Sequence, residues 1–183
     1  NLVLGAPEKL LLEDYPLYKD EIVSLSSRGF RVLVFGVYEG FLDGKPLLRP
    51  VKPLAIVTLW NAIRPEARAT FQYFKDQGVD IKVISGDNPV TVSYVARSAG
   101  IAGADSYVDA TELVTEADFA RAVKQYTVFG RVSPEQKRKL VNAIKADGNV
   151  VAMTGDGVND VLALKDADCS IAFGSGSDAA CNA

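Results

Sequence analysis

The 183 residues carry 20 lysines and arginines against 23 aspartates and glutamates, which gives a formal charge of −3. This acidic balance argues against a nucleic-acid-binding protein, which needs a basic surface. The sequence contains no histidine, and this excludes Ser-His-Asp catalysis and every metal site with a histidine ligand. The two cysteines, Cys169 and Cys181, lack metal-ligand spacing and predict no disulfide framework. No apolar run reaches the roughly 18 residues of a transmembrane candidate, so we expect a soluble segment in a reducing compartment.

The first sixty residues have the pattern of an antiparallel α+β segment. A helix is predicted over residues 17–28 and should end at Gly29. Apolar residues at 30–38 and 54–60 predict two strands. The Asp-Gly pair at 43–44 predicts a hairpin-type turn between them.

From residue 61 onward the pattern changes to alternating strands and helices. This alternation predicts an α/β fold, in which a doubly wound parallel sheet carries helices on both faces. Ligands of such sheets bind at the carboxyl ends of the strands. Strands are predicted over residues 81–84, 107–108, 127–129, 150–153 and 170–173.

Several helix starts in this second part can be read locally. Pro65 and Pro89 are each placed to open a helix. Ser133 and Gln136 have the spacing of a capping box, with a proline between them at the first helical position. Thr115 and Asp118 resemble a second capping pair.

The strongest chemical signal is the segment Thr-Gly-Asp-Gly-Val-Asn-Asp at residues 154–160. Its glycines let the backbone turn sharply and approach a ligand. The carboxylates of Asp156 and Asp160 are hard oxygen ligands of the kind that Mg²⁺ prefers. The alternative is an Asx-rich turn between a strand and a helix, and the full seven-residue pattern favours the metal-binding interpretation.

Two weaker signals also follow predicted strands. Ser85, Gly86 and Asp87 place a hydroxyl and backbone N–H groups before a helix start, where a phosphate oxygen can bind. Lys137 lies just inside the helix that Ser133 caps, and its ammonium group would neutralise phosphoryl oxygens. The alternatives are an ordinary Ser-Gly-Asp turn and a solvated surface lysine.

Together, these three loops resemble the haloacid dehalogenase superfamily, whose Rossmann-like fold carries a Ser/Thr, a Lys and an acidic pair at strand ends. More narrowly, the sequence resembles a P-type, cation-transporting ATPase over essentially all 183 residues. The resemblance implies that residues 1–60 are the C-terminal part of a nucleotide-binding domain, and that residues 61–183 are a phosphorylation domain without its nucleophile strand. The segments that carry it are residues 5–8, Arg31, Arg64-Pro65, 131–137, 153–160 and 170–178.

The resemblance also implies roles for single residues in phosphoryl transfer, with Mg²⁺ as cofactor and ATP as substrate. Asp156 would be the side-chain ligand of Mg²⁺, and Asp160 would support the site through hydrogen bonds and charge. The residues that would contact the phosphoryl group are Ser85, Gly86, Lys137 and Asn159. Those that would lie near ATP are Arg31, Arg64 and Asp87.

For the parent protein, the resemblance implies a pump that couples ATP hydrolysis, through an aspartyl phosphate, to cation transport. This chain would lie at the cytoplasmic face of a membrane, with an actuator domain and transmembrane helices as partners within the same pump. The family's Asp-Lys-Thr-Gly-Thr segment, which holds the phosphorylated aspartate, is not in the sequence, so we expect the chain alone to be inactive. Leu4 and Asn61 replace a lysine and an aspartate that the family usually has, and the first change should weaken ATP binding.

Two other functions remain open at this point. One is a soluble haloacid dehalogenase-type phosphatase with a cap domain, acting on a small phosphate ester. The other is a non-catalytic regulatory domain that keeps the same fold. The nucleotide-domain signature at residues 5–8 argues against the first, and the intact Asp156, Asp160 and Lys137 argue against the second.

Overall fold

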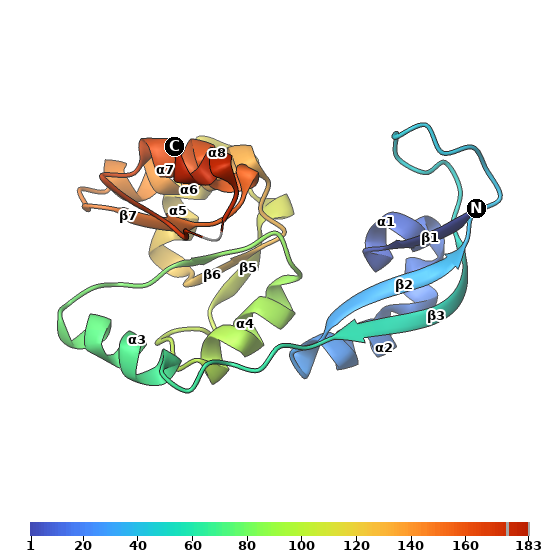
Figure 1. Ribbon diagram of the computed structural model, residues 1–183, viewed down its shortest axis with the longest axis horizontal. Helices are drawn as coiled ribbons and strands as arrows, with labels where there is room; N and C mark the ends of the chain where they lie inside the picture. Colours follow the sequence, from blue (N-terminus) through green and yellow to red (C-terminus); the bar gives the residue numbers. More distant parts are fainter. Residues whose placement is uncertain (175, 183) are drawn as a thin grey trace. The chain divides into compact units, whose positions relative to one another are not determined.

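A computed structural model describes residues 1–174 and 176–182. The chain divides into two compact units, Asn1–Pro65 and Glu66–Ala183, which are drawn together in Figure 1 and are taken separately below. The division falls after Pro65, whereas the sequence pattern placed the domain boundary after residue 60. In the described residues, no helix is both long and apolar enough to cross a membrane.

The unit Asn1–Pro65 is an antiparallel sheet with helices on one face. Its strands follow the order β1-β2-β3, and Val32 and Val34 of β2 are buried against Leu11 and Ile22 of the helices. The helix and strands predicted from the sequence are confirmed. The elements are β1 (Leu2–Gly5), α1 (Pro7–Leu11), the 3₁₀ turn η1 (Leu12–Asp14), α2 (Tyr15–Ser27), β2 (Arg31–Val37) and β3 (Lys52–Leu59).

The hairpin-type turn predicted at residues 43–44 lies inside a longer connection between β2 and β3. The two strands do pair as antiparallel neighbours, but the connection runs from Tyr38 to Val51. Within it, Gly44 has a positive φ of +80°, and the backbone N–H of Lys45 donates to Asp43 Oδ1 at 3.1 Å. The Asp-Gly signal therefore marks a local bend inside a longer loop.

In the unit Glu66–Ala183, every strand pair that the structure describes is parallel, as predicted. The strands form a three-stranded sheet of order β4-β6-β5 and a two-stranded sheet β7-β8. Strand β7 begins at Ala152 rather than at residue 150. The elements are α3 (Ala67–Asp76), β4 (Val83–Ile84), α4 (Pro89–Ser98), β5 (Tyr107–Asp109), η2 (Ala110–Glu112), α5 (Glu116–Gln125), β6 (Val128–Gly130), α6 (Pro134–Ala146), β7 (Ala152–Gly155), η3 (Val158–Asp160), α7 (Val161–Asp166), β8 (Cys169–Ala172) and α8 (Asp178–Cys181).

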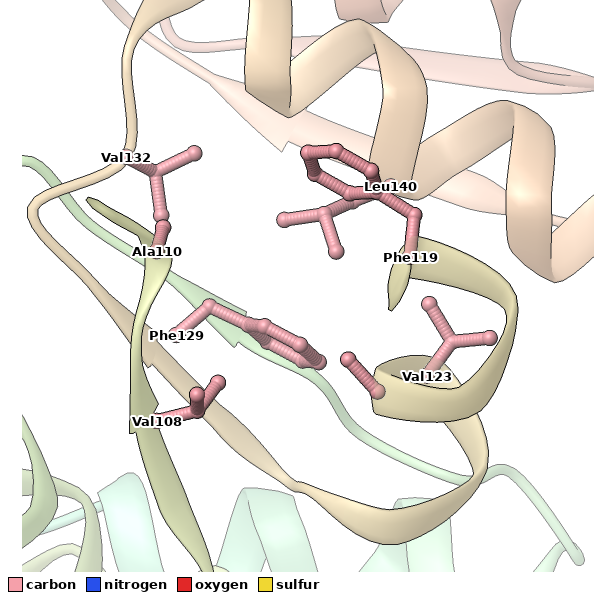
Figure 2. Close-up of a cluster of buried hydrophobic side chains, with 8 residues drawn as sticks. Val108, Ala110, Phe119, Val123, Phe129, Val132 and Leu140 are labelled. Carbon is pink, nitrogen blue, oxygen red and sulfur yellow. The ribbon is translucent and has the colours of Figure 1, made fainter. Parts of the chain in front are cut away.

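Helices cover both faces of the sheet around β6. Val128 and Phe129 are consecutive strand residues, so their side chains point to opposite faces, and both are fully buried. Val128 packs in a cluster with Val92 of α4. Phe129 packs with Phe119 of α5 and Leu140 of α6 (Figure 2). This two-sided burial confirms the predicted α/β, Rossmann-like fold.

Helix α3 lies where local signals in the sequence predicted it. It begins at Ala67, shortly after the predicted start at Pro65, and Gly78 follows it with a positive φ of +74°. The predicted apolar side is present in sequence, but no residue of the helix is buried, and Phe74 is 40% exposed. Periodicity therefore predicted the helix correctly without predicting burial.

Candidate functional site

An ion pair between Lys137 and Asp160 lies at the centre of the candidate site. Nζ of Lys137, on α6, donates to Oδ1 of Asp160 at 2.6 Å. Both side chains are largely buried, at 13% and 10% exposure. Lys137 is therefore a buried ion-pair partner and not the solvated surface charge that the sequence left open.

The second oxygen of Asp160 holds the loop that follows β7. Oδ2 accepts the backbone N–H groups of Asp156 at 3.3 Å and Gly157 at 3.1 Å. Burial alone would raise the pKa of Asp160, but the Lys137 ammonium and these two N–H groups together lower it below its ordinary value. A Cβ at Gly155 would lie 2.5 Å from Cβ of Asp160, so only glycine allows this close approach.

The carboxylate of Asp156 is exposed and is left available by this arrangement. Within the described part of the chain, no hydrogen bond or ion pair reaches it. Mg²⁺ is commonly bound through one or two carboxylates together with water and substrate phosphates. Among the same residues, no group of three or more acidic or cysteine side chains could hold a metal. Asp156 therefore fits Mg²⁺ that is shared with a phosphate, and not a metal enclosed by protein ligands.

The loop after β4 is fastened mainly through its backbone. The N–H of Ser85 donates to the carbonyl of Phe129 at 2.9 Å, and the N–H of Val132 donates to the carbonyl of Ser85 at 3.0 Å. Oγ of Ser85 accepts the N–H of Asp87 at 3.1 Å. These bonds tie the Ser85 loop to the segment between β6 and α6, which leads to Lys137.

Arg131 links this segment to the loop after β4 and to β5. Its N–H donates to the carbonyl of Asp87 at 2.8 Å, and its guanidinium Nη1 pairs with Oδ2 of Asp109 at 2.6 Å. The backbone of Arg131 is left-handed, with φ of +53°, a conformation that is uncommon outside glycine. The chain can therefore turn sharply from β6 towards the start of α6.

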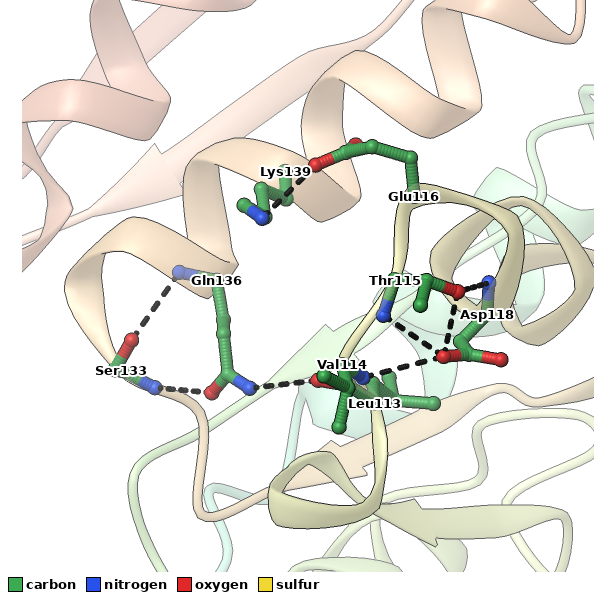
Figure 3. Close-up of polar contacts among 8 residues, drawn as sticks. All are labelled: Leu113, Val114, Thr115, Glu116, Asp118, Ser133, Gln136 and Lys139. Carbon is green, nitrogen blue, oxygen red and sulfur yellow. Dashed lines mark hydrogen bonds and ion pairs between the residues drawn. The ribbon is translucent and has the colours of Figure 1, made fainter.

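The start of α6 sets the position of Lys137. Ser133 and Gln136 form the predicted capping box, with bonds of 3.1 and 3.2 Å between each backbone N–H and the other side chain. Nε2 of Gln136 also donates to the carbonyl of Ala110 at 2.7 Å, and a longer contact reaches Leu113 (Figure 3). The helix start that carries Lys137 is thus fixed both by its own cap and by the turn after β5.

The other predicted site residues are not all joined to this cluster. Within the described chain, no hydrogen bond or ion pair joins Ser85 directly to Lys137. Asn159 is exposed on η3. Arg31 on β2 and Arg64 after β3 are exposed residues of the other unit, Asn1–Pro65.

Comparison with known proteins places this geometry in a family. Residues 10–168 match the family of haloacid dehalogenase-like hydrolases. The chain belongs to this family. The fold and the acidic loop after β7 agree with the resemblance to the same superfamily that the sequence motifs indicated.

Relatives of this chain include several proteins named as calcium- or cation-transporting ATPases. The chain is 45% identical over 180 residues to the calcium-transporting ATPase CtpE of Mycolicibacterium smegmatis. This alignment covers 98% of the chain and 22% of CtpE. The chain is 43% identical over 181 residues to the probable cation-transporting ATPase exp7 of Streptococcus pneumoniae, covering 98% of the chain and 23% of exp7. The endoplasmic reticulum calcium ATPase srcA of Aspergillus fumigatus is 32% identical to the chain over 217 residues, and the alignment covers 98% of the chain and 22% of srcA. The chain thus spans less than a quarter of the length of these relatives.

Sequence reasoning missed two supporting features of this haloacid dehalogenase-like site. The first is the pair between Asp109 and Arg131, which joins the last residue of β5 to the residue that follows β6. The second is the close packing of Gly130, where a Cβ would lie 2.4 Å from Cα of Pro89. The Gly-Arg pair at the end of a strand was the available signal for a tight turn, but nothing in the local sequence identified its partners.

Proposed function

We propose that this chain is the cytoplasmic phosphorylation-domain part of a P-type ATPase that couples ATP hydrolysis, through an aspartyl phosphate, to cation transport across a membrane. The observation that carries the proposal is the buried Lys137–Asp160 pair beside the carboxylate of Asp156, which has no partner among residues 1–174 and 176–182. The printed names of the relatives, calcium- and cation-transporting ATPases, support the same function.

The contacts of Asp156, Asp160 and Lys137 indicate a different role for each residue. Asp160 is already bonded to Lys137 and to two backbone N–H groups, so its role is to hold the loop and the ammonium group in place. Asp156 would be the ligand of Mg²⁺, which supplies positive charge beside the transferred phosphoryl group. Lys137 would present its remaining donors to the phosphoryl oxygens, because an ammonium carries three N–H groups.

The remaining polar residues would bind phosphate and nucleotide. The hydroxyl of Ser85 accepts from Asp87, and this leaves its own hydrogen free to donate to a phosphoryl oxygen. Gly86 is exposed next to it, so its backbone N–H would also be close to that group. Asn159 would contact the phosphoryl group or brace the loop, and Arg31, Arg64 and Asp87 would contribute near ATP.

The proposal also concerns the organisation of the parent pump. Residues 1–60 would be the end of a nucleotide-binding domain, and residues 61–183 would be the phosphorylation domain. The actuator domain and the transmembrane helices would belong to the rest of the same polypeptide. The sequence contains no Asp-Lys-Thr-Gly-Thr segment, so the chain alone would not form a phosphoenzyme.

Phosphoenzyme labelling tests this function. With radiolabelled ATP and Mg²⁺, we expect acid-stable labelling of the full-length protein and none of the 183-residue chain. Asp156→Asn in the full-length protein should abolish labelling, whereas Asp105→Asn, at an exposed surface ion pair, should leave it unchanged. Labelling of the isolated chain would show that it contains its own acceptor and would overturn the assignment.

A further inference from the structure

The main chain of Asp156 is held from two sides. On one side, its N–H donates to Oδ2 of Asp160 in its own loop. On the other, its carbonyl oxygen accepts the N–H of Ser177 at 2.8 Å. Both main-chain polar groups of Asp156 are therefore bonded inside the chain, and the carboxylate is its one polar group without a partner among the described residues.

The contact with Ser177 depends on a glycine beside it. A Cβ at Gly176 would lie 2.7 Å from the carbonyl oxygen of Asp156, 2.9 Å from that of Phe173 and 3.1 Å from Cα of Asp156. All three are backbone atoms, which cannot rotate away as the end of a side chain can. Any larger residue at 176 must therefore displace the Asp156 backbone or its own loop. At Gly174, by contrast, a Cβ would meet no heavy atom of the described residues within 4 Å.

The loops after β7 and β8 meet because the two strands are parallel neighbours that end at the same register. Gly155 of β7 lies opposite Ala172 of β8, so both strands end at the same edge of the sheet. After β8, the N–H of Gly176 donates to the carbonyl of Phe173 at 2.8 Å. Oγ of Ser177 then accepts the N–H of Ala180 and caps α8. The N–H of Ser177 is thus directed at Asp156 by contacts on both sides of it.

We propose that Gly176 and Ser177 are positioning residues that fix the backbone of Asp156, so that its carboxylate is preorganised for Mg²⁺. This inference rests on the proposed role of Asp156 as the Mg²⁺ ligand. A ligand whose backbone is fixed loses less conformational freedom when it binds. Contacts that orient metal ligands in this way typically change metal affinity by about 10–100-fold when they are removed.

A matched pair of glycine variants tests the proposal in the 183-residue chain. Mg²⁺ alone is titrated while the backbone amide resonances of Asp156 and Gly157 are followed by NMR. We expect Gly176→Ala to weaken Mg²⁺ binding by about 10–100-fold and Gly174→Ala to leave it unchanged. Equal affinities in wild type and Gly176→Ala would overturn the proposal, and so would equal losses in both variants, which would indicate a general weakening of the loop.

Hydrogen exchange of the Ser177 amide provides a second measurement that needs no metal. A bonded N–H exchanges slowly because the structure must open first, so we expect protection in the wild type and faster exchange in Gly176→Ala. An unprotected Ser177 amide in the wild type would overturn the proposal even if the variant failed to fold. If Mg²⁺ shifts no amide of the wild type, the proposed Mg²⁺ role of Asp156 fails, and exchange alone then decides whether Gly176 and Ser177 hold its backbone.

Discussion

The loops after β4 and β7 are fastened in different ways. The loop at Ser85–Asp87 is held by backbone bonds to Phe129, Arg131 and Val132. The loop at Asp156–Asp160 has a backbone bond from the N–H of Ser177, but most of its bonds are made by a single carboxylate, which accepts from Lys137 and from two N–H groups of its own loop. One loop therefore depends on the course of the backbone, and the other depends on the charge of one side chain.

The two loops should therefore differ in how strongly single substitutions disrupt them. Every residue type except proline can donate a backbone N–H, so the Ser85 loop should tolerate most single substitutions at its own positions. A buried carboxylate that loses its partner keeps its desolvation cost without compensation. The loop that carries the proposed Mg²⁺ ligand should therefore be the more easily disrupted of the two.

The largest expected effect comes from removing the charge partner of Asp160. Lys137→Ala leaves a carboxylate that is only 10% exposed without its ammonium. We expect a loss of about 3 kcal/mol in the free energy of unfolding, at the low end of the range for a broken buried pair, because two backbone N–H groups still bind Asp160. Urea denaturation, followed through the amide exchange of Phe129, measures this loss within the unit that contains the site.

A surface pair is the control for that prediction. Lys124 and Asp147 form an ion pair in which the lysine side chain is 61% exposed, so Lys124→Ala should cost no more than about 1 kcal/mol. Similar losses in both variants would mean that the Lys137–Asp160 pair is not buried in solution, and the contrast between the two loops would disappear.

A smaller effect is expected from Arg131, which supports the loop after β4. Arg131→Gly and Arg131→Ala both remove the pair with Asp109 and keep the backbone N–H that donates to Asp87. Only the alanine variant keeps a side chain at the left-handed φ of +53°, which costs about 1–2 kcal/mol outside glycine. We therefore expect Arg131→Ala to be less stable than Arg131→Gly by about 1 kcal/mol in urea denaturation. Equal stabilities would show that residue 131 is not left-handed in solution.

The sequence predicted contacts between residues that are close along the chain, and it did not predict contacts between residues that are far apart. The caps at Thr115 and Ser133 involve partners three residues away, and both were predicted correctly. The acidic loop after β7 was predicted because its residues are contiguous. The contact of Arg131 with Asp109 and that of Ser177 with Asp156 join residues about twenty positions apart. Such contacts depend on which strands become neighbours, and a single sequence does not contain that information.

The smallest expected effect is a loss of stability in acid, where Asp160 becomes protonated. This loss does not occur at neutral pH. The pKa of Asp160 is lowered in the folded chain because the Lys137 ammonium and two N–H groups outweigh the effect of burial. A carboxyl whose folded pKa lies below its unfolded value, near about 3.9, binds fewer protons folded than unfolded. It therefore stabilises the fold fully above that unfolded value, and this contribution is lost as the pH falls through the folded pKa.

Because other carboxylates titrate in the same range, the useful quantity is the difference in unfolding free energy between wild type and Asp160→Asn. This difference should stay constant from pH 7 to about pH 5 and then shrink below about pH 4. The Gly174→Ala variant provides the contrast, because it changes no ionisable group, leaves Asp160 and its partners in place and should show the acid dependence of the wild type. If the difference in unfolding free energy between wild type and Asp160→Asn stays constant down to pH 3, ionised Asp160 does not stabilise the folded loop. The loop after β7 would then be held by its backbone, like the loop after β4.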